Sequence, residues 1–515
     1  MFDLGVFTIA PQLKTKGHKV NIIFIPDLMR ECYAPKELSN KTVNRICEFL
    51  QPSDLIGINC LSENYLKTSI FVDYIKKTLN KPLVWGGIHA TLRPQDCIRH
   101  ADMVCVGEGE EAIVELACKM GSKEPIGNIN NMIFKDFNSK MTNLTLRPPV
   151  DLNLLKPFDY DLEYQYIVEG ANIRNVKESD FKGNFLSYSS RGCPFRCSYC
   201  CNSTMLDKTY KGEKYCRQRN VDKIIEELKN IKSKFVSCKA IWFNEADFLH
   251  GKPQVTIDDF SRKYKAEINI PFYIWTNPAS INEYNIPGLV SAGFKETNIG
   301  TINANPEIQK GVYNRTATST LYKNASTILK NNNVLVEYDF ILCNPYEKKE
   351  HIINNINLLR SFPLPFKTVI YSLTYFSDTV LFDKAVKDGI INRESYASSY
   401  IEAAYKAWFF NDENTYLNGI ASMMRGPARR VKYFGKVYGL LPGAVIDILT
   451  SGPFVKFFSL RLFRFTLYPL FGTVIKMIYV MIVRVIRFYR MLMCAPKMLY
   501  DTILADKEKK CRPIF

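Results

Sequence analysis

Three cysteines lie close together in the stretch Arg191-Gly192-Cys193-Pro194-Phe195-Arg196-Cys197-Ser198-Tyr199-Cys200. The stretch follows residues 184–190, an apolar and aromatic run that is typical of a strand. Three thiolates in one short loop suit a soft metal better than a disulfide, and an iron–sulfur cluster is the obvious candidate. A [4Fe–4S] cluster has four irons, so three protein ligands leave one iron open to another molecule. The alternative is a zinc site, which normally takes four ligands, and the adjacent Cys201 is poorly placed to be the fourth.

The composition is that of a globular, multidomain protein. The chain has 515 residues, of which 47% are hydrophobic and 23% charged, enough for three or four domains. Its formal net charge of +17 predicts an anionic partner, either nucleic acid or an acidic membrane surface. The fifteen cysteines form no paired framework and no signal peptide opens the sequence, which indicates reduced, intracellular thiols. We therefore expect a cytoplasmic protein, or one bound peripherally to the inner face of a membrane.

The first region, residues 1–125, alternates helical and strand patterns. Helices are expected at 4–13, 42–50 and 68–79, and strands at 20–25, 55–59, 82–85 and 103–106. This alternation predicts a doubly wound, Rossmann-like parallel sheet. Glycines follow two of its strands, in Gly86-Gly87-Ile88-His89-Ala90-Thr91 and in Gly107-Glu108-Gly109-Glu110. Glycines at the carboxyl ends of parallel strands let a ligand approach the backbone closely.

The order of these motifs resembles the cobalamin-binding domain that precedes the catalytic domain of many radical S-adenosylmethionine (SAM) enzymes. Asn59-Cys60-Leu61 stands where the broader cobalamin fold has a Ser-x-Leu loop. The resemblance implies that cobalamin contacts Asn59, Leu61, Gly86, Gly87, His89, Gly107, Glu108 and Gly109. Taken alone, His89 is a turn histidine with a satisfied hydrogen bond.

Two departures from that family are visible. The expected first strand is missing, because Met1 lies almost at the start of the first helix. The broader fold also has a cobalt-ligating histidine three residues before the first helix glycine. If Gly5 is that glycine, Phe2 holds the position, and no protein histidine ligates the lower face of the cobalt.

Residues 126–183 are rich in Asn, Asp, Lys and Pro, and we expect a linker that short strands order in part. From residue 184 to about 400 the strand and helix patterns alternate again. Strands are expected at 184–190, 240–243, 272–275, 296–300, 335–342 and 368–373. About six such units predict a partial (β/α)6 barrel with its chemistry at the carboxyl ends of the strands.

This second region resembles the radical SAM domain. Cys193, Cys197 and Cys200, with the aromatic Tyr199 before the last, match the family's signature. The resemblance implies that the three cysteines hold a [4Fe–4S] cluster, and that SAM contacts Tyr199, Asn244, Glu245, Asp247, Gly300 and Asn303. The family often has Gly-x-Glu-Ser where this chain has Gly300-Thr301-Ile302-Asn303, so Asn303 would replace a carboxylate. A reducing partner such as ferredoxin or flavodoxin is implied as well.

The last region, residues 401–515, is predicted to be helical. Residues 451–500 contain no Asp or Glu, while Lys476, Arg484, Arg487 and Arg490 fall on one helix face of an otherwise apolar segment. This pattern favours a helix lying in a membrane interface on anionic lipid, over a spanning helix or one docked on the protein's own core. Nucleic acid is disfavoured, because a large aliphatic surface dilutes the basic residues.

The leading hypothesis is a cobalamin-dependent radical SAM enzyme that methylates carbon in a lipid-like or isoprenoid small molecule at a membrane. The same cofactors serve cyclisation or rearrangement in related proteins, and the positive charge keeps tRNA modification as a further alternative. A non-catalytic sensor or scaffold is a third class, against which the complete cysteine triad argues.

Overall fold

The computed structural model describes residues 4–29, 38–135, 144–158, 160–393 and 417. The expected helical region 401–515, with its basic segment, lies outside the described residues except for Leu417. Phe2 lies outside them too. Within the part of the chain that the structure describes, no helix is long and apolar enough to cross a membrane.

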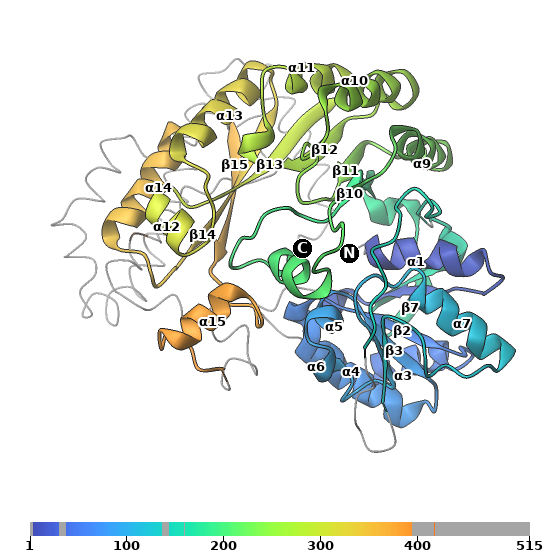
Figure 1. Cartoon of the computed structure of the whole chain (residues 1–515). Helices are drawn as coiled ribbons and strands as arrows, with labels where there is room; N and C mark the ends of the chain where they lie inside the picture. Colours follow the sequence, from blue (N-terminus) through green and yellow to red (C-terminus); the bar gives the residue numbers. More distant parts are fainter. Residues whose placement is uncertain (1–3, 30–37, 136–143, 159, 394–416, 418–515) are drawn as a thin grey trace, which may run out of the picture. The chain divides into compact units, whose positions relative to one another are not determined.

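A four-stranded sheet in the order β2-β3-β4-β5 forms the centre of the first domain (Figure 1). Its strands are β2 (Ile56–Asn59), β3 (Leu83–Gly86), β4 (Met103–Cys105) and β5 (Met132–Phe134). Its helices are α3 (Asn40–Leu50), α4 (Tyr65–Thr78), α5 (Ile88–Leu92), α6 (Pro94–Cys97) and α7 (Ala112–Ser122). Strands β2 to β4 are parallel, and β5 is antiparallel to β4. The predicted Rossmann-like sheet is confirmed, with an antiparallel edge strand added to it.

Buried apolar side chains hold this sheet between its helices. Trp85 and Val104 have no exposed surface, and Ile46 of α3 and Val72 of α4 pack in the same core. The Ser39 side chain caps α3 by accepting a hydrogen bond from the backbone N–H of Thr42. The carboxyl ends of β2 and β3 are thereby fixed side by side, with Asn59 opposite Gly86.

A second, three-stranded sheet has the order β1-β6-β7. Strand β1 (Ile22–Phe24) lies in the chain between α1 (Leu4–Lys14) and α2 (Pro26–Met29). It pairs in parallel with β6 (Gln165–Glu169). Strand β6 in turn pairs antiparallel with β7 (Asn172–Asn175). The expected strand at 20–25 therefore forms, but it pairs with β6 and not with β2. The region expected to be a linker, 126–183, contributes β5 to the first sheet and β6 and β7 to this one.

The radical SAM region forms an open sheet of six parallel strands, in the order β15-β14-β13-β12-β11-β8. The strands are β8 (Asn184–Ser187), β11 (Ala240–Phe243), β12 (Phe272–Thr276), β13 (Phe294–Ile302), β14 (Leu335–Leu342) and β15 (Phe366–Ser372). The helices are α9 (Val221–Lys234), α10 (Gln254–Lys263), α11 (Asn285–Ala292), α12 (Pro306–Gly311), α13 (Ser319–Asn331), α14 (Lys349–Ser361) and α15 (Val380–Lys387). The predicted partial barrel is confirmed, and among the described residues it does not close.

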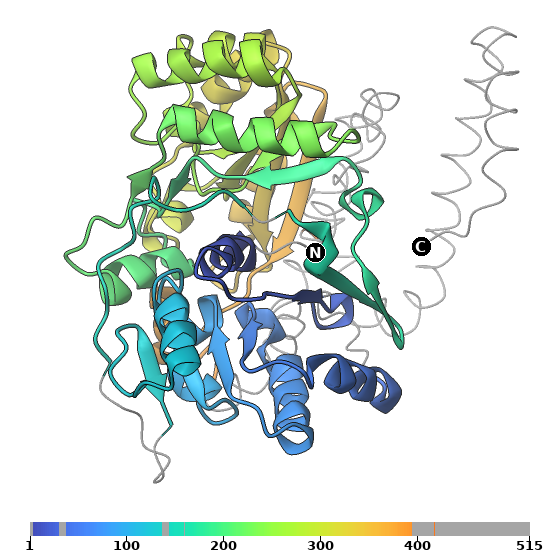
Figure 2. The same cartoon turned by 90° about the vertical axis from the view of Figure 1, so that its right-hand side faces the viewer.

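Helices α9 to α14 line the outer side of this sheet (Figure 1, Figure 2). On that side the strands place fully buried aromatic rings, among them Phe243, Phe272 and Phe294. Phe272 and Phe294 stack at 5.7 Å. The opposite, inner side of the sheet carries polar and aromatic residues, and the carboxyl ends of the strands lead to the candidate site.

Candidate radical SAM and cobalamin site

The three-cysteine loop is fixed at its start by a short ribbon. Strand β9 (Ser190–Arg191) pairs antiparallel with β10 (Arg217–Gln218), so residues 192–216 form an excursion between them that includes α8 (Cys201–Thr204). Gly192 has a φ of 92°, and a Cβ atom there would lie 2.4 Å from the carbonyl oxygen of Tyr215. Only glycine fits this close approach, which sets the direction in which the chain reaches Cys193.

Hydrogen bonds hold the rest of the loop from both sides. The Ser198 N–H donates to the carbonyl oxygen of Tyr313 at 3.0 Å, and the Leu381 N–H donates to the carbonyl oxygen of Ser198 at 2.8 Å. The Ser203 hydroxyl donates to the carbonyl oxygens of Cys197 and Cys200 at 2.9 and 2.7 Å. The loop is therefore ordered both by its own Ser203 and by residues that come more than 100 positions later in the chain.

Cys193, Cys197 and Cys200 are free thiols. Cys197 is buried and the other two are half-buried. Among the residues that the structure describes, no three Cys, His, Asp or Glu side chains converge closely enough to hold a single metal ion. A four-iron cluster makes a different demand, because its thiolate ligands bind different irons. Three free thiols on one anchored loop fit such a cluster.

Arg315 supplies the charge next to this loop. Its Nη1 atom lies 3.4 Å from the Cys197 sulfur and 3.4 Å from the Tyr199 hydroxyl, and its Nη2 atom donates to the Gly300 carbonyl oxygen at 2.8 Å. No carboxylate pairs with Arg315 among the described residues. A largely buried cation without an acid is costly unless an anion is near, and thiolates that bind a cluster meet that need. Arg315 has no local sequence signal for this role, because the contact joins residues 118 positions apart.

Three residues expected to hold SAM follow β11, and they differ in how far their side chains are buried. Asn244 is exposed, and its backbone N–H donates to Ser187 at 2.9 Å. Glu245 is buried and accepts hydrogen bonds from Ser189 and Ser190. Asp247 is buried as well and accepts hydrogen bonds from the Thr276 and Ser280 hydroxyls at 2.8 and 2.7 Å. Glu245 and Asp247 thus tie strand ends together in this structure, and Asn244 has the most exposed side chain of the three.

Two further expected SAM residues lie at the end of β13. Gly300 contributes the carbonyl oxygen that Arg315 binds. Asn303 is fully buried; its Nδ2 atom donates to Glu347 at 2.6 Å and its Oδ1 atom accepts from the Asn305 N–H at 3.0 Å. The Asn303 amide is therefore occupied inside the fold. Tyr199, in contrast, packs edge-on against Tyr313 at 5.4 Å, beside the thiols.

A cavity of about 460 Å³ adjoins the cysteine loop. Gly192 and Pro194 of the loop, Arg217 of β10, and Asp247 and His250 after β11 lie in its wall. Its volume is in the range of small-molecule sites. The cavity therefore brings one expected SAM residue, Asp247, next to the cluster loop. Arg217 and His250 also lie there and were not among the expected site residues.

The expected cobalamin motifs meet at the carboxyl edge of the first sheet. Gly87 has a φ of 94°, and a Cβ atom there would lie 1.8 Å from the Asn59 side-chain oxygen. Gly86 stands opposite Asn59 in the register, and Leu61 is 49% exposed beyond it. The structure thus forms a backbone cradle at the position where such sheets bind ligands.

His89 follows these glycines in α5 and is 1% exposed. Its Nδ1 atom is 3.0 Å from the Ser62 hydroxyl, and its ring stacks on Tyr65 at 4.3 Å. Its Nε2 atom is buried without a partner in the described structure. Burial lowers the pKa of His89 to about 4, so the ring is neutral near pH 7. An orphaned polar atom next to a glycine cradle fits a ligand rich in polar groups, as cobalamin is.

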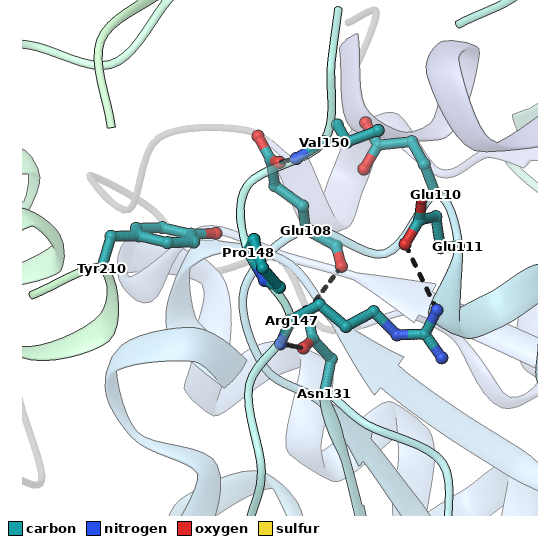
Figure 3. Close-up of a pocket in the computed structure, with 8 residues that line it drawn as sticks. All are labelled: Glu108, Glu110, Glu111, Asn131, Arg147, Pro148, Val150 and Tyr210. Carbon is teal, nitrogen blue, oxygen red and sulfur yellow. Dashed lines mark hydrogen bonds and ion pairs between the residues drawn. The ribbon is translucent and has the colours of Figure 1, made fainter. Parts of the chain in front are cut away.

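The second glycine motif makes close contacts to other elements. The Gly107 N–H donates to the Thr91 hydroxyl at 3.0 Å, and a Cβ atom at Gly107 would lie 3.0 Å from the Tyr210 hydroxyl oxygen. A Cβ atom at Gly109 would lie 3.1 Å from Ile9 of α1. Figure 3 shows a small pocket beside this motif. Its wall includes Glu108, Glu110, Glu111, Arg147 and Tyr210.

Glu108 connects this motif to the cysteine loop. Its carboxylate accepts hydrogen bonds from Arg217 at 2.6 Å, from Arg191 at 3.1 Å and from the Val150 N–H at 2.8 Å. Burial alone would raise the pKa of Glu108, but the Arg217 hydrogen bond and the Arg191 charge hold it below its ordinary value. Glu110 also pairs with Arg191, at 2.7 Å. Since Arg191 stands two residues before Cys193, this ion-pair network links the two candidate cofactor sites.

A Rossmann-like sheet with a glycine cradle, followed by an open sheet of parallel strands with a three-cysteine loop, defines a radical SAM enzyme with a cobalamin-binding domain. Residues 1–117 match the family model of the B12 binding domain, and residues 187–359 match that of the radical SAM superfamily. The chain belongs to the radical SAM proteins that carry a B12-binding domain. Its cofactors are a [4Fe–4S] cluster, SAM and cobalamin.

Among curated proteins, the chain is similar to an uncharacterised methyltransferase of Pyrococcus horikoshii, with 25% identity over 57% of this chain and 62% of the relative. It is also similar to the anaerobic magnesium-protoporphyrin IX monomethyl ester cyclase of Rubrivivax gelatinosus, with 23% identity over 72% of this chain and 64% of the relative. The chain thus spans a little under two thirds of the length of these two relatives.

Two solved structures share the fold. The radical SAM methyltransferase TsrM from Kitasatospora setae, with tryptophan and a SAM analogue bound, superimposes with a TM-score of 0.60 at 14% identity, covering 75% of this chain and 73% of TsrM. The cobalamin-dependent radical SAM enzyme OxsB superimposes with a TM-score of 0.55 at 17% identity, covering 77% of this chain and 54% of OxsB.

Proposed function

We propose that this protein is a cobalamin-dependent radical SAM methyltransferase that methylates a carbon atom of a small molecule. The ion-pair network of Glu108 with Arg191 and Arg217 is the observation that carries the proposal. It joins a loop of the cobalamin-binding domain to the strand that leads into Cys193, so that a methyl donor and a radical generator would act on one substrate. One curated relative is named as a methyltransferase and another as a cyclase, and cyclisation is the second candidate reaction.

In this proposal, Cys193, Cys197 and Cys200 hold the cluster, and the cavity that Asp247 and His250 line receives SAM. Asn59, Gly86, Gly87, His89 and the Gly107–Gly109 motif hold cobalamin. The bound cofactors supply the radical and the methyl group, while the protein orients them and excludes water. Arg315 keeps positive charge beside Cys197, and the buried Glu245 and Asp247 keep the strand ends in place.

The finer part of the proposal is a lipid-like or isoprenoid substrate, at the inner face of a membrane. It rests on the sequence of residues 451–500, whose spacing predicts basic residues on one face of an otherwise apolar helix. A truncation after Gly452 tests it: the full chain should sediment with vesicles that contain anionic lipid, and the truncated chain should stay in the supernatant. Equal partition of the two chains would contradict the membrane part alone.

Anaerobic reconstitution with iron, sulfide, SAM and cobalamin tests the reaction. Incubation with small-molecule and lipid extracts should yield 5′-deoxyadenosine, S-adenosylhomocysteine and a product heavier by one methyl group, all detected by mass spectrometry. A Cys197→Ala variant should yield none of them, and Cys201→Ala is the matched control. Deoxyadenosine without S-adenosylhomocysteine would overturn methylation and favour cyclisation or rearrangement.

A further inference from the structure

The inner face of the six-stranded sheet carries an aromatic group and an acidic group side by side. Register partners in a parallel sheet point to the same face, and Trp275 of β12 stands opposite Asn298 of β13, which stands opposite Glu337 of β14. One row earlier, Trp242 stands opposite Tyr273. The buried rings of Phe243, Phe272 and Phe294 occupy the other face, against the helices. We call Trp242, Tyr273, Trp275, Asn298, Glu337 and Asp339 the inner-face group.

The aromatic half of this group offers a flat apolar surface. Trp242 and Tyr273 stack with their ring centroids 4.6 Å apart and their planes at 27°. Trp275, one pleat further along β12, keeps 41% of its surface exposed. An exposed indole beside a stacked aromatic pair is suited to cover a planar group of a ligand.

The acidic half holds two carboxyl groups without a matching cation, and burial raises the pKa of Asp339 to about 7, so that this group is only partly ionised at neutral pH. The Asn298 Nδ2 atom donates to Glu337 at 3.2 Å and to Asp339 at 2.9 Å. Lys367 stands opposite Glu337 in the register but pairs instead with Glu296, at 2.6 Å. Among the described residues no Lys, Arg or His pairs with Glu337 or Asp339. Because partly buried carboxylates need donors, this half suits a ligand that donates hydrogen bonds or carries positive charge.

The inner-face group lies close to the cysteine loop. Gly300 stands opposite Asp339 and two residues beyond Asn298 on β13. The Gly300 carbonyl oxygen accepts the hydrogen bond of Arg315, and Arg315 contacts Cys197. Asp339 is therefore level with the residue that Arg315 binds, and Trp275, Asn298 and Glu337 lie two residues earlier on their strands.

We infer that the inner-face group binds the substrate, and that this substrate carries an amine or a comparable hydrogen-bond donor next to a planar apolar ring. The inference rests on the proposed methylation of a small molecule, and for this site it favours an aminated ring compound over the lipid-like or isoprenoid substrate. Planar rings pack on Trp275 and on the Trp242–Tyr273 pair, and the donor meets Glu337 and Asp339. A phosphate or carboxylate at the same place meets acidic side chains and no paired cation, so an isoprenoid diphosphate does not suit this site.

Three probes with one ring system test the inference: naphthalen-2-ylmethylamine, naphthalen-2-ylmethanol and 2-naphthoate. Isothermal titration calorimetry on the full-length, cluster-reconstituted protein should show that the amine binds at least tenfold more tightly than the carboxylate. The double variant Glu337→Gln, Asp339→Asn should lose this preference, whereas Trp275→Ala should weaken the amine and the alcohol alike. Glu226→Gln, on the exposed face of α9, is the matched control.

Equal affinity of the wild type for amine and carboxylate, absence of binding by all three probes, or an unchanged preference in the double variant would overturn the inference. If circular dichroism shows that the double variant is unfolded, the isosteric Asp339→Asn variant alone should reduce the preference. A methyl-transfer assay separates the two proposals. A probe preference without any methyl transfer would overturn the proposed function only, and methyl transfer that the double variant retains in full would overturn the substrate site only.

Discussion

The Nη1 atom of Arg315 lies 3.4 Å from the sulfur of Cys197, and the other terminal nitrogen of the same guanidinium holds the Gly300 carbonyl oxygen. One side chain thus joins the cysteine loop to the carboxyl end of β13. Its Nε atom is buried and has no partner in the described structure. The arginine therefore brings both a fixed positive charge and hydrogen-bond donors to the loop that we propose binds the cluster.

Replacement of Arg315 should lower the reduction potential of the cluster. Reduction adds negative charge, and the hydrogen bonds and positive charge around cluster sulfurs favour it. For Arg315→Met we expect a shift toward more negative potential on the order of 60 mV, which is about tenfold in a one-electron equilibrium. Redox titration followed by electron paramagnetic resonance measures it.

Arg196→Met is the control for this experiment. Arg196 belongs to the same loop, but it is mostly exposed and its guanidinium pairs with Asp207 at 2.9 Å. An equal shift in both variants would show that loop charge in general, and not the Arg315 contact, sets the potential.

Each of Cys193→Ala, Cys197→Ala and Cys200→Ala should lose the cluster, because removal of one thiolate leaves a second iron without a protein ligand. Iron and sulfide analysis after anaerobic reconstitution should fall from about four of each per chain to near zero. Cys201→Ala is the neighbouring-thiol control and should keep the full content. A variant of the triad that retains four irons would show that Cys201 or Cys216 serves as a ligand.

The cysteine triad could be predicted from the sequence because all three ligands and their spacing fall within eight residues. The strands and helices around it follow from local periodicity as well, and the structure places β11, β13 and β14 over the expected residues. Contacts between distant segments leave no such local signal. The pairing of β1 with β6 and the ion pairs of Glu108 with Arg191 and Arg217 are of this kind.

Asn303 shows how one backbone irregularity changes a site. The register of β13 against β14 shifts between Gly300 and Ile302, and Ile302 has a φ of 65°. A one-residue shift in a strand turns the following side chains to the other face. Asn303 consequently lies among Glu347 and Asn305 instead of beside the cysteine loop. Apolar and polar alternation in the sequence does not reveal such a bulge.

Gly87→Ala should damage the cobalamin cradle. The backbone angles of Gly87, φ 94° and ψ −173°, fall in a region that only glycine adopts readily, and the new Cβ atom would overlap the Asn59 side chain. Strain of this type costs about 1–3 kcal/mol. We expect at least a tenfold loss in cobalamin affinity, measured by the absorbance of cobalamin retained after gel filtration.

Gly57→Ala is the control for the cradle, because Gly57 lies in the neighbouring strand β2 and a Cβ atom there meets nothing within 4 Å. It should leave cobalamin affinity unchanged. Equal cobalamin binding by the Gly87→Ala variant and the wild type would contradict the assignment of Gly86 and Gly87 to the cobalamin site.

The buried His89 should make the stability of the first domain depend on pH. Burial lowers the pKa of His89 to about 4 in the folded protein, below the ordinary value of 6.5. The unfolded chain therefore binds the proton first, and the stability present above pH 6.5 is lost as the pH falls toward 4. The loss amounts to at most about 3 kcal/mol. In His89→Gln this part of the pH dependence should disappear, as measured by urea unfolding of the apoprotein between pH 4 and 7. Ser62→Ala removes the hydrogen-bond partner but keeps the imidazole, so it should retain the slope of the unfolding free energy against pH. A His89→Gln protein with the wild-type slope would mean that another group controls acid unfolding.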